Sequence, residues 1–525
     1  MKLILLFLFF VVCTQSYKIL VYNSKFGHSH SNFHGSVADA LAEAGHIVTS
    51  LIPILDRNVR DGTTKSHIMY IEPVPEVEEN YRNGANMTMN FLDMNNFNPI
   101  LPFFMGKFMK KFVTTCGKTL DEPGLIEKLR DEHFDVYIAQ NFDYCGIGLA
   151  HLIKPKAIVS ASPSTLNGYL FEDLGVPEAL SYRPAPYMSL LNIHSLIDRA
   201  WNIYASYALR GLTYALRRDM NAFFKERYGA DYPSIEDQAG NAALIIVNAE
   251  PLIDYAAPTL TKVINIGGIG AKPAKPLDEY WTEILTRRDR TILLSFGSMV
   301  KSVNLSPAQK LAIVKMVSAF PDITFIWKYE RPEDEFSAEH SSKLKNLVLS
   351  KWMPQADILA HPNLALFITH GGMGSTMETA SRGVPGIFIP VIGDQPRNAG
   401  MMQYNGFGKV YDKFDLASAE KLTATVREVL GNGKYRENAQ RISKMLARKP
   451  YSSKEQLVKH VEFVAEFGPS SALRPQSLDM TFIEYNNLDL IAVFFIIIAL
   501  GLYVTKKLAV IIYRKLTMKG KPKKE

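Results

Sequence analysis

The chain has 525 residues, of which 47% are hydrophobic and 21% charged, and it contains three cysteines. This length is too great for one hydrophobic core, so at least two large domains are expected. The formal net charge of +7 comes entirely from the end of the chain, because residues 506–525 hold eight Lys or Arg and one Glu. The rest is neutral overall, which argues against nucleic acid as a partner.

The chain begins with a pattern typical of a secretory signal peptide. A lysine and an apolar run precede Thr14 and Ser16, which supply the small residues that a cleavage site needs. The pattern predicts a signal peptide over residues 1–16 and a mature protein that begins at Tyr17.

Short apolar runs then alternate with helical patterns, which is typical of parallel α/β domains. In the first half, strands are predicted at residues 18–22, 46–53, 136–139, 157–160 and 244–248, with a helix at 33–45. In the second half they are predicted at residues 291–296, 324–328, 347–349, 364–369 and 386–389. A stretch rich in Gly, Pro and Lys separates the halves and reads as a linker. The resulting boundaries are 17–270 for the first domain, 271–285 for the linker and 286–445 for the second domain.

Two segments of the first half allow more than one interpretation. Residues 87–112 contain five Met and six Phe, side chains that suit a pocket for varied lipophilic molecules. The same residues would suit an ordinary core or a membrane-facing surface equally well. The helical segment at residues 190–216 is open to the same alternatives.

The C-terminal part of the chain predicts a membrane anchor. Residues 446–487 are expected to form helices that return toward the first domain. Fifteen apolar residues, 490–504, rise only about 22 Å as a helix, so the anchor is extended to residues 488–513 to cross a hydrocarbon core of about 30 Å. The basic tail, residues 514–525, is expected in the cytosol by the positive-inside rule. It ends Lys-Pro-Lys-Lys-Glu, the form of a dilysine retrieval signal for the endoplasmic reticulum.

Two cysteines and two sequons remain in the predicted mature chain. Cys116 and Cys145 could pair, but buried thiols are expected, since a domain of this size does not need a disulfide. Asn86 and Asn304 lie in Asn-X-Ser/Thr sequons and are predicted glycosylation sites.

A polar block at residues 352–395 has the composition of a sugar-nucleotide site. The predicted strand at 364–369 runs into His370-Gly371-Gly372 and then a helical pattern. A strand, a glycine turn and a helix N-terminus leave backbone N–H groups free to hold a diphosphate. His370 adds a donor able to carry positive charge, and a strand end followed by polar residues is where open α/β sheets bind ligands. The competing interpretation is an ordinary strand–turn–helix unit with a glycine turn. The residues expected to contact the sugar nucleotide are Ser298, Trp352, Gln355, His370, Gly372, Gly374, Ser375, Glu378, Asp394 and Gln395, the two glycines through their backbone.

Nine positions of this block, in register over 44 residues, resemble the signature of the animal UDP-glycosyltransferases, the family of the UDP-glucuronosyltransferases. They are Trp352, Gln355, His370, Gly371, Gly372, Ser375, Glu378, Asp394 and Gln395. The resemblance runs from the signal peptide to the anchor. It implies the GT-B fold: two Rossmann-like domains facing across a cleft, here followed by a single C-terminal transmembrane helix. It also implies that Trp352 stacks on uracil and that Gln355 contacts the uracil edge. Many relatives have Asn at the position of Gly374, where backbone contact would replace a side chain.

The family places its catalytic His after a Ser, sixteen residues before a Gly-His pair. His30 follows Ser29 and precedes His46 by sixteen residues, so His30 is the predicted base, with His28 and His34 as local competitors. Relatives orient this His with a carboxylate at a position where this chain has Gln140. Gln140 cannot stabilise an imidazolium as a carboxylate does, and Asp143 is the nearest substitute.

The sequence therefore predicts inverting transfer of glucuronate or glucose from a UDP-sugar to a hydroxyl of a small lipophilic acceptor. No metal is expected, because the sequence has no DxD motif and no ligand cluster with metal spacing. The enzyme is expected in the endoplasmic reticulum membrane as a single-pass type I protein with a luminal catalytic domain; a homo-oligomer is compatible with it. Two alternatives are a pseudoenzyme that binds UDP-sugar or lipid without turnover, which Gln140 favours, and a transferase acting on protein or lipid-linked glycan.

Overall fold

The computed structural model describes residues 15–84, 92, 101–166, 168–271, 273–298 and 300–518. These form two compact units, one ending at residue 473 and one beginning at residue 474. Most of the predicted signal peptide, Asn86, most of residues 87–100 and the dilysine end of the tail lie outside the described residues.

The first half of the larger unit is built on a seven-stranded parallel sheet of order β3-β2-β1-β4-β5-β6-β7. Its strands are β1 Lys18–Tyr22, β2 Ile47–Pro53, β3 His67–Ile71, β4 Val136–Gln140, β5 Ala157–Ser162, β6 Leu244–Val247 and β7 Val263–Asn265. The five predicted strands are present. The additional β3 and β7 are the edge strands; β3 is only partly buried and β7 has three residues, so neither shows the continuous apolar run of a central strand.

The second half contains a six-stranded parallel sheet of order β10-β9-β8-β11-β12-β13. Its strands are β8 Arg290–Ser295, β9 Ile323–Lys328, β10 Leu347–Ser350, β11 Leu364–Thr369, β12 Gly386–Phe388 and β13 Gly408–Val410. All five predicted strands are confirmed, and β13 is again a short edge strand. Each sheet has its own buried cluster, so the prediction of two parallel α/β domains is confirmed.

Helices connect the parallel strands in both halves. Those of the first half are α1 His28–Glu43, α2 Pro75–Gly84, α3 Leu101–Leu120, α4 Leu125–Asp131, α5 Cys145–Ile153, α6 Gly168–Asp173, α7 Leu196–Tyr228 and α8 Ile235–Gly240. Those of the second half are α9 Glu279–Thr286, η1 Ser302–Asn304, α10 Pro307–Ser318, α11 Glu335–Lys343, α12 Gln355–Ile358, α13 Met373–Arg382, α14 Gln395–Tyr404, η2 Lys413–Asp415, α15 Ala419–Gly431 and α16 Gly433–Ala447. The helix predicted at residues 33–45 is α1, which begins earlier. Helix α9 lies largely inside the segment predicted as a linker. Its first turn is stabilised by the Asp278 side chain, which accepts from the Trp281 N–H as an N-cap.

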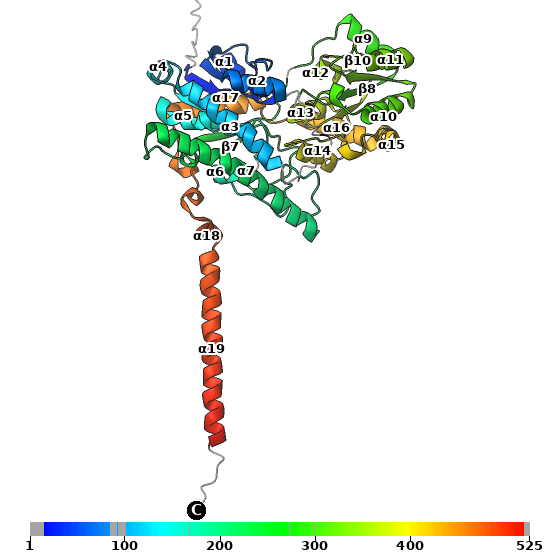
Figure 1. Ribbon diagram of the computed structural model, residues 1–525. Helices are drawn as coiled ribbons and strands as arrows, with labels where there is room; N and C mark the ends of the chain where they lie inside the picture. The colour runs from blue at the N-terminus through cyan, green and yellow to red at the C-terminus, as the bar shows by residue number, and fades with distance from the viewer. Residues whose placement is uncertain are drawn as a thin grey trace, which may run out of the picture. The chain divides into compact units, whose positions relative to one another are not determined.

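After the second sheet the chain returns to the first. Helix α17 Ser453–Phe467 contacts α1, β4, β6 and β7, and in Figure 1 it lies in orange among the blue helices. Its buried face, which includes Leu457, Val461 and Val464, joins the apolar cluster under β1 and α1. The C-terminal end of the larger unit is thereby built into the N-terminal domain.

A disulfide joins Cys116 on α3 to Cys145 at the start of α5, with 5.6 Å between the two Cα atoms. The expectation of buried thiols was therefore wrong. Helices α3 and α5 pack against each other and bring the two buried side chains together, and this tertiary contact leaves no trace in the spacing of two cysteines. The bond ties α3 to the loop that follows β4.

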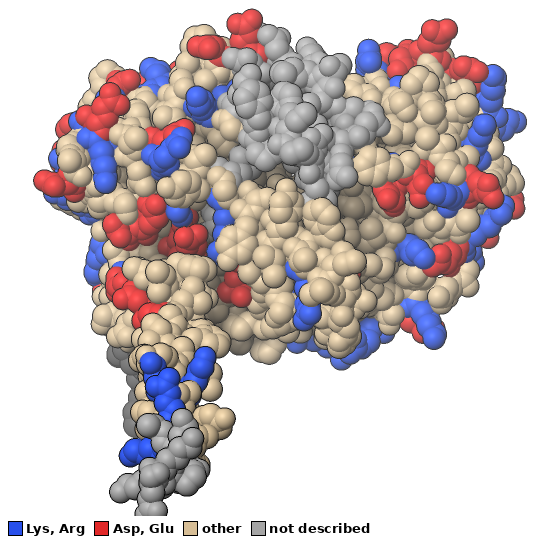
Figure 2. Space-filling view, turned by 60° about the horizontal axis from the view of Figure 1, so that its bottom comes forward, with Lys and Arg blue, Asp and Glu red and all other residues tan. Residues whose placement is uncertain are grey.

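The two ambiguous segments differ in the structure. In the described part of residues 87–112, Met109 and Phe112 are buried in the core of the first domain, which favours the core interpretation there. Helix α7 instead exposes large apolar side chains, among them Leu196 (74% exposed) and Trp201 (48%). Figure 2 brings forward the side on which α7 lies in Figure 1 and shows a broad area without Lys, Arg, Asp or Glu. An ordinary core is thus excluded for this part of α7.

The second unit consists mainly of one long helix. After η3 Ser471–Leu473, which ends the larger unit, come η4 Gln476–Asp479, α18 Phe482–Tyr485 and α19 Leu488–Met518. Within residues 488–517 an 18-residue stretch has a mean hydropathy of 2.5, and α19 is long and apolar enough to cross a membrane. Lys and Arg gather near its C-terminal end in Figure 2.

Candidate functional site

The glycine turn after β11 holds His370 in a tight, buried position. A Cβ on Gly297 would lie 2.5 Å from the His370 ring, and one on Gly372 would lie 2.7 Å from it, so both positions require glycine. Gly297 and Gly371 also have positive φ, at 79° and 81°. Burial lowers the pKa of His370 to about 4. With this pKa the imidazole is neutral near pH 7 and donates through one ring N–H.

Helix α13 begins directly after this turn, and its first turn is uncapped. Gly372 is the N-cap residue and offers no side-chain acceptor, so the N–H groups of the first turn stay available to an anion. At Gly374 an added Cβ would meet no atom within 4 Å.

Three polar side chains from the predicted block meet beside α13. Gln355 donates through Nε2 to Glu378 Oε2 at 2.7 Å and to Ser375 Oγ at 3.1 Å. Burial raises the pKa of Glu378, and the bond from Gln355 opposes that shift. Residues separated by 23 positions in sequence thus converge, which the HGG motif alone does not predict.

Trp352 lies on the loop before α12 and is 61% exposed. An exposed indole is free to stack on a planar base. Two cations already face its ring: Lys328 Nζ, at the end of β9, lies 5.7 Å from the centroid, and the Arg60 guanidinium lies 4.7 Å from it. Ser298 is exposed on the turn after β8.

Asp394 is tied to the glycine turn through Asn398, a residue that the sequence analysis missed. Asn398 Nδ2 donates to Asp394 Oδ2 at 2.8 Å and to the Gly371 carbonyl at 3.1 Å. Burial raises the pKa of Asp394. The spacing of four residues on α14 was the available signal, since such residues share a helix face. The Gln395 Oε1 atom accepts from the backbone N–H groups of Val391 and Ile392, so its amide NH2 group is the part available to a ligand.

The N-terminal domain contacts this helix through a buried ion pair. Arg397 on α14 is 1% exposed and pairs with Asp254, which also lies 3.9 Å from Arg183. The Gly400 position has no room for a side chain, because a Cβ there would meet the Ser189 carbonyl oxygen at 1.5 Å. The helix that starts at Asp394 is therefore packed directly on the first domain.

His30 lies in the first turn of α1 among aromatic rings. Its ring centroid is 4.4 Å from that of Phe26 and 5.2 Å from that of Phe142, and its ring Nδ1 is 3.4 Å from Ser29 Oγ. Burial lowers the pKa of His30 to about 3. The competitor His34 is bound to the His30 carbonyl through Nδ1 and is buried, so it is not available to substrate.

Asp143 is buried and bonded elsewhere. It accepts from Ser24 Oγ at 2.6 Å and from Gln140 Nε2 at 2.8 Å, and Gln140 also reaches Ser24. Burial raises its pKa to about 6. Within the described part of the chain, no carboxylate makes a hydrogen bond with the His30 ring. Gln140 and Asp143 thus form a unit under the β1 and β4 loops that leaves His30 without an acidic partner.

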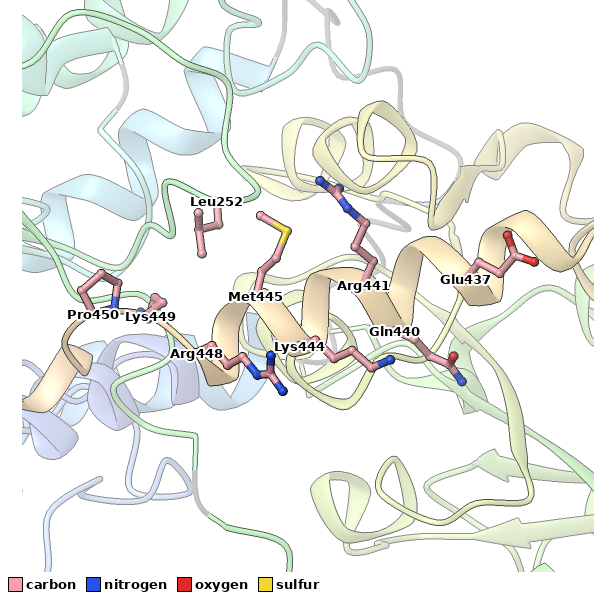
Figure 3. Close-up of a pocket in the computed structure, with 9 residues that line it drawn as sticks. All are labelled: Leu252, Glu437, Gln440, Arg441, Lys444, Met445, Arg448, Lys449 and Pro450. Carbon is pink, nitrogen blue, oxygen red and sulfur yellow. The ribbon is translucent and has the colours of Figure 1, made fainter.

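A pocket of about 700 Å³ lies elsewhere, along α16 (Figure 3). It is lined by Leu252, Glu437, Gln440, Arg441, Lys444, Met445, Arg448, Lys449 and Pro450. None of the predicted site residues lines it. In the residues that the structure describes, no group of three or more His, Cys, Asp or Glu is placed to hold a metal ion.

Comparison with known proteins identifies the family of the chain. The family described as UDP-glucoronosyl and UDP-glucosyl transferase matches residues 17–523. The putative UDP-glucuronosyltransferase ugt-48 of Caenorhabditis elegans is 33% identical, with 92% of this chain and 93% of the relative covered. Human UDP-glucuronosyltransferase 3A1 is 27% identical, with 98% and 97% covered.

Solved structures show the same fold. The glycosyltransferase of kitacinnamycin superposes with a TM-score of 0.56 at 18% identity, covering 88% of this chain and all of its own. The glycosyltransferase VinC, solved in complex with DTDP, gives 0.54 at 17% identity, covering 86% and all of its own. The GT-B prediction is confirmed. The chain belongs to the UDP-glucuronosyl and UDP-glucosyl transferase family and is a UDP-sugar glycosyltransferase.

Proposed function

We propose that the enzyme transfers glucuronate or glucose, with inversion, from a UDP-sugar to a hydroxyl of a small lipophilic acceptor. The observation that carries this proposal is the convergence of the donor block. The exposed Trp352, the Gln355–Glu378 bond and the Asn398–Asp394 bond all lie around the uncapped start of α13. An aromatic plane, an uncapped helix N-terminus and sugar-binding carboxylates are the three features that a UDP-sugar requires.

The acceptor would bind beside His30, where Phe26 and Phe142 supply an apolar wall. His30 is neutral near pH 7 because burial disfavours its charged form, so it is ready to take a proton. In the proposed step the acceptor oxygen forms a bond to the anomeric carbon as its proton passes to His30. The bond from that carbon to the diphosphate breaks, and its electron pair leaves with UDP. Attack opposite the leaving group inverts the anomeric centre.

Asp143 would position the loops beside His30 and would not contact the substrate. Its bonds to Ser24 and Gln140 hold together the loops that follow β1 and β4, which carry Phe26 and Phe142. His30 would therefore work without a carboxylate partner, at a lower rate than a dyad allows. We propose further that no metal is needed, because the N–H groups of α13 and the nearby cations offset the diphosphate charge.

The cellular setting is proposed from the termini. A signal peptide, one candidate span at α19 and a basic tail would place the catalytic domains in the lumen of the endoplasmic reticulum. Asn304 is exposed and would be accessible for glycosylation there.

The test is UDP release by the detergent-solubilised full chain, with UDP-glucuronate or UDP-glucose and a panel of phenols and sterols. Acceptor-dependent release with one donor, abolished in His30→Ala and lowered in Asp394→Ala, is expected. His34→Gln is the matched control, since that side chain faces the protein interior.

The missing carboxylate at His30 favours a second candidate, a protein that binds UDP-sugar without turnover. Donor binding by calorimetry without release across the whole panel would establish it. In that event Gln140→Glu is the variant to test for restored activity.

A further inference from the structure

The loop between β2 and β3, residues 54–66, is held rigidly against α1. A Cβ on Gly62 would lie 1.9 Å from the Ser31 carbonyl oxygen, and one on Gly35 would lie 2.0 Å from the Gly62 backbone. Asp61 is fixed from three sides, by Lys25 at 2.7 Å, by Tyr70 at 2.8 Å and through its carbonyl by Asn23 at 2.9 Å. The backbone at Arg60, directly before these contacts, has little freedom.

From this anchored loop Arg60 reaches the second domain. Its guanidinium lies 4.7 Å from the centroid of the Trp352 ring. Within the described residues, no carboxylate pairs with Arg60, and its guanidinium makes a cation–π contact with the indole ring. Another exposed arginine of the loop, Arg57, instead pairs with Glu72 and Glu78. Arg60 is thus held over the Trp352 ring with no acidic partner among the residues that the structure describes.

The surroundings of Arg60 are positive. Lys328 also faces Trp352, and its one recorded acidic neighbour is Glu330 at 4.0 Å. Burial lowers the pKa of His28, Arg60 and Lys328 lower it further, and Asp56 opposes them. Two cations beside the same ring favour a polyanionic ligand, because binding neutralises their charge.

We propose that Arg60 is a donor-binding residue supplied by the acceptor domain: it covers Trp352 in the free enzyme and moves to the diphosphate when uracil takes the ring. This inference rests on the proposed function. A guanidinium suits both positions, since it stacks on aromatic faces and also makes paired hydrogen bonds to phosphate oxygens. The exchange makes the rigid β2–β3 loop part of the donor site, so nucleotide binding joins the two domains at a point next to His28 and α1.

The test compares three ligands on full-length wild type, Arg60→Ala and Arg60→Lys by calorimetry in detergent: uridine, UDP and UDP-glucuronate. Arg60→Ala is expected to weaken UDP binding by about 10- to 100-fold, as the loss of a charge-assisted contact does. Uridine affinity should change less than about threefold, because stacking on Trp352 is kept. The UDP affinity of Arg60→Lys should lie between those of wild type and Arg60→Ala. Arg57→Ala, on the same loop but paired with glutamates, is the matched control and should bind all three ligands like wild type.

Each other outcome has a distinct meaning. Unchanged UDP binding in Arg60→Ala, with normal UDP binding by wild type, overturns the inference and leaves the proposed function standing. An equal loss for uridine and UDP overturns it as well, since the effect is then on stacking. A loss of affinity confined to UDP-glucuronate would show that Arg60 contacts the uronate and not the diphosphate, and would overturn the inference. Failure of wild type to bind UDP at all overturns both proposals.

Discussion

Removing the Cys116–Cys145 disulfide by Cys116→Ala/Cys145→Ala should destabilise the larger unit by a calculable amount. The two residues are 29 positions apart, and the chain-entropy relation gives about 3.6 kcal/mol at 25 °C for a loop of that length. Spread over a unit of this size, whose unfolding entropy is about 1 kcal/mol/K, the loss lowers the unfolding temperature by about 4 °C. Both side chains are buried, so the replaced sulfur atoms add a small packing loss in the same direction.

The assay is differential scanning fluorimetry of the full chain at one fixed heating rate. Wild type treated with reductant before heating serves as the control, because it opens the bond without changing a side chain. It should melt at or slightly above the temperature of the double variant, which alone has the packing loss. Maleimide labelling of unfolded protein, with and without reduction, counts the thiols: two more should react after reduction.

The reasoning is refuted if labelling finds the two additional thiols and yet the variant and the reduced protein melt within 1 °C of the oxidised protein. The bond would then exist without constraining the unfolded chain. If reduction releases no additional thiols, the pairing itself is wrong. Activity gives a second readout, since α5 follows the loop that carries Asp143.

Three further changes test the site. Gln140→Glu should raise the rate of transfer if a carboxylate there reaches His30, whereas an unchanged rate in an active enzyme would show that the network with Asp143 already suffices. Arg397→Met should cost about 3 kcal/mol by leaving Asp254 buried beside Arg183 alone, measured by urea unfolding; a variant as stable as wild type would contradict the buried pair. His30 has its pKa lowered from 6.5 to about 3, so the unfolded chain binds a proton that the folded chain does not. Its stabilising contribution is present above pH 6.5 and is lost as the pH falls toward 3. His30→Gln should therefore reduce the acid slope of the unfolding free energy by about 1.4 kcal/mol per pH unit near pH 5, and equal slopes in the two proteins would refute the pKa shift.

Local pattern was sufficient for the framework of the fold. The central strands are buried on both faces, so they read as continuous apolar runs, and the predicted β1 and β11 coincide with the observed ones. The edge strands β3, β7 and β13 were missed because they are short or only half buried. At the donor site the HGG turn and α13 followed from adjacent residues, while Asn398 needed the α14 face to be seen against Gly371.

The sequence by itself determined the central strands of both sheets, the long apolar C-terminal helix and the HGG turn before α13, because these depend on neighbours along the chain and on hydrophobic periodicity. Only the tertiary structure decided which distant groups meet. Cys116 and Cys145 pair, Arg397 lies on Asp254, and Arg60 covers Trp352 across 292 positions of sequence. Burial, likewise a tertiary property, keeps His370 neutral. The physical reason is that packing and desolvation depend on which residues are close in space. The order of residues along the chain does not give these neighbours.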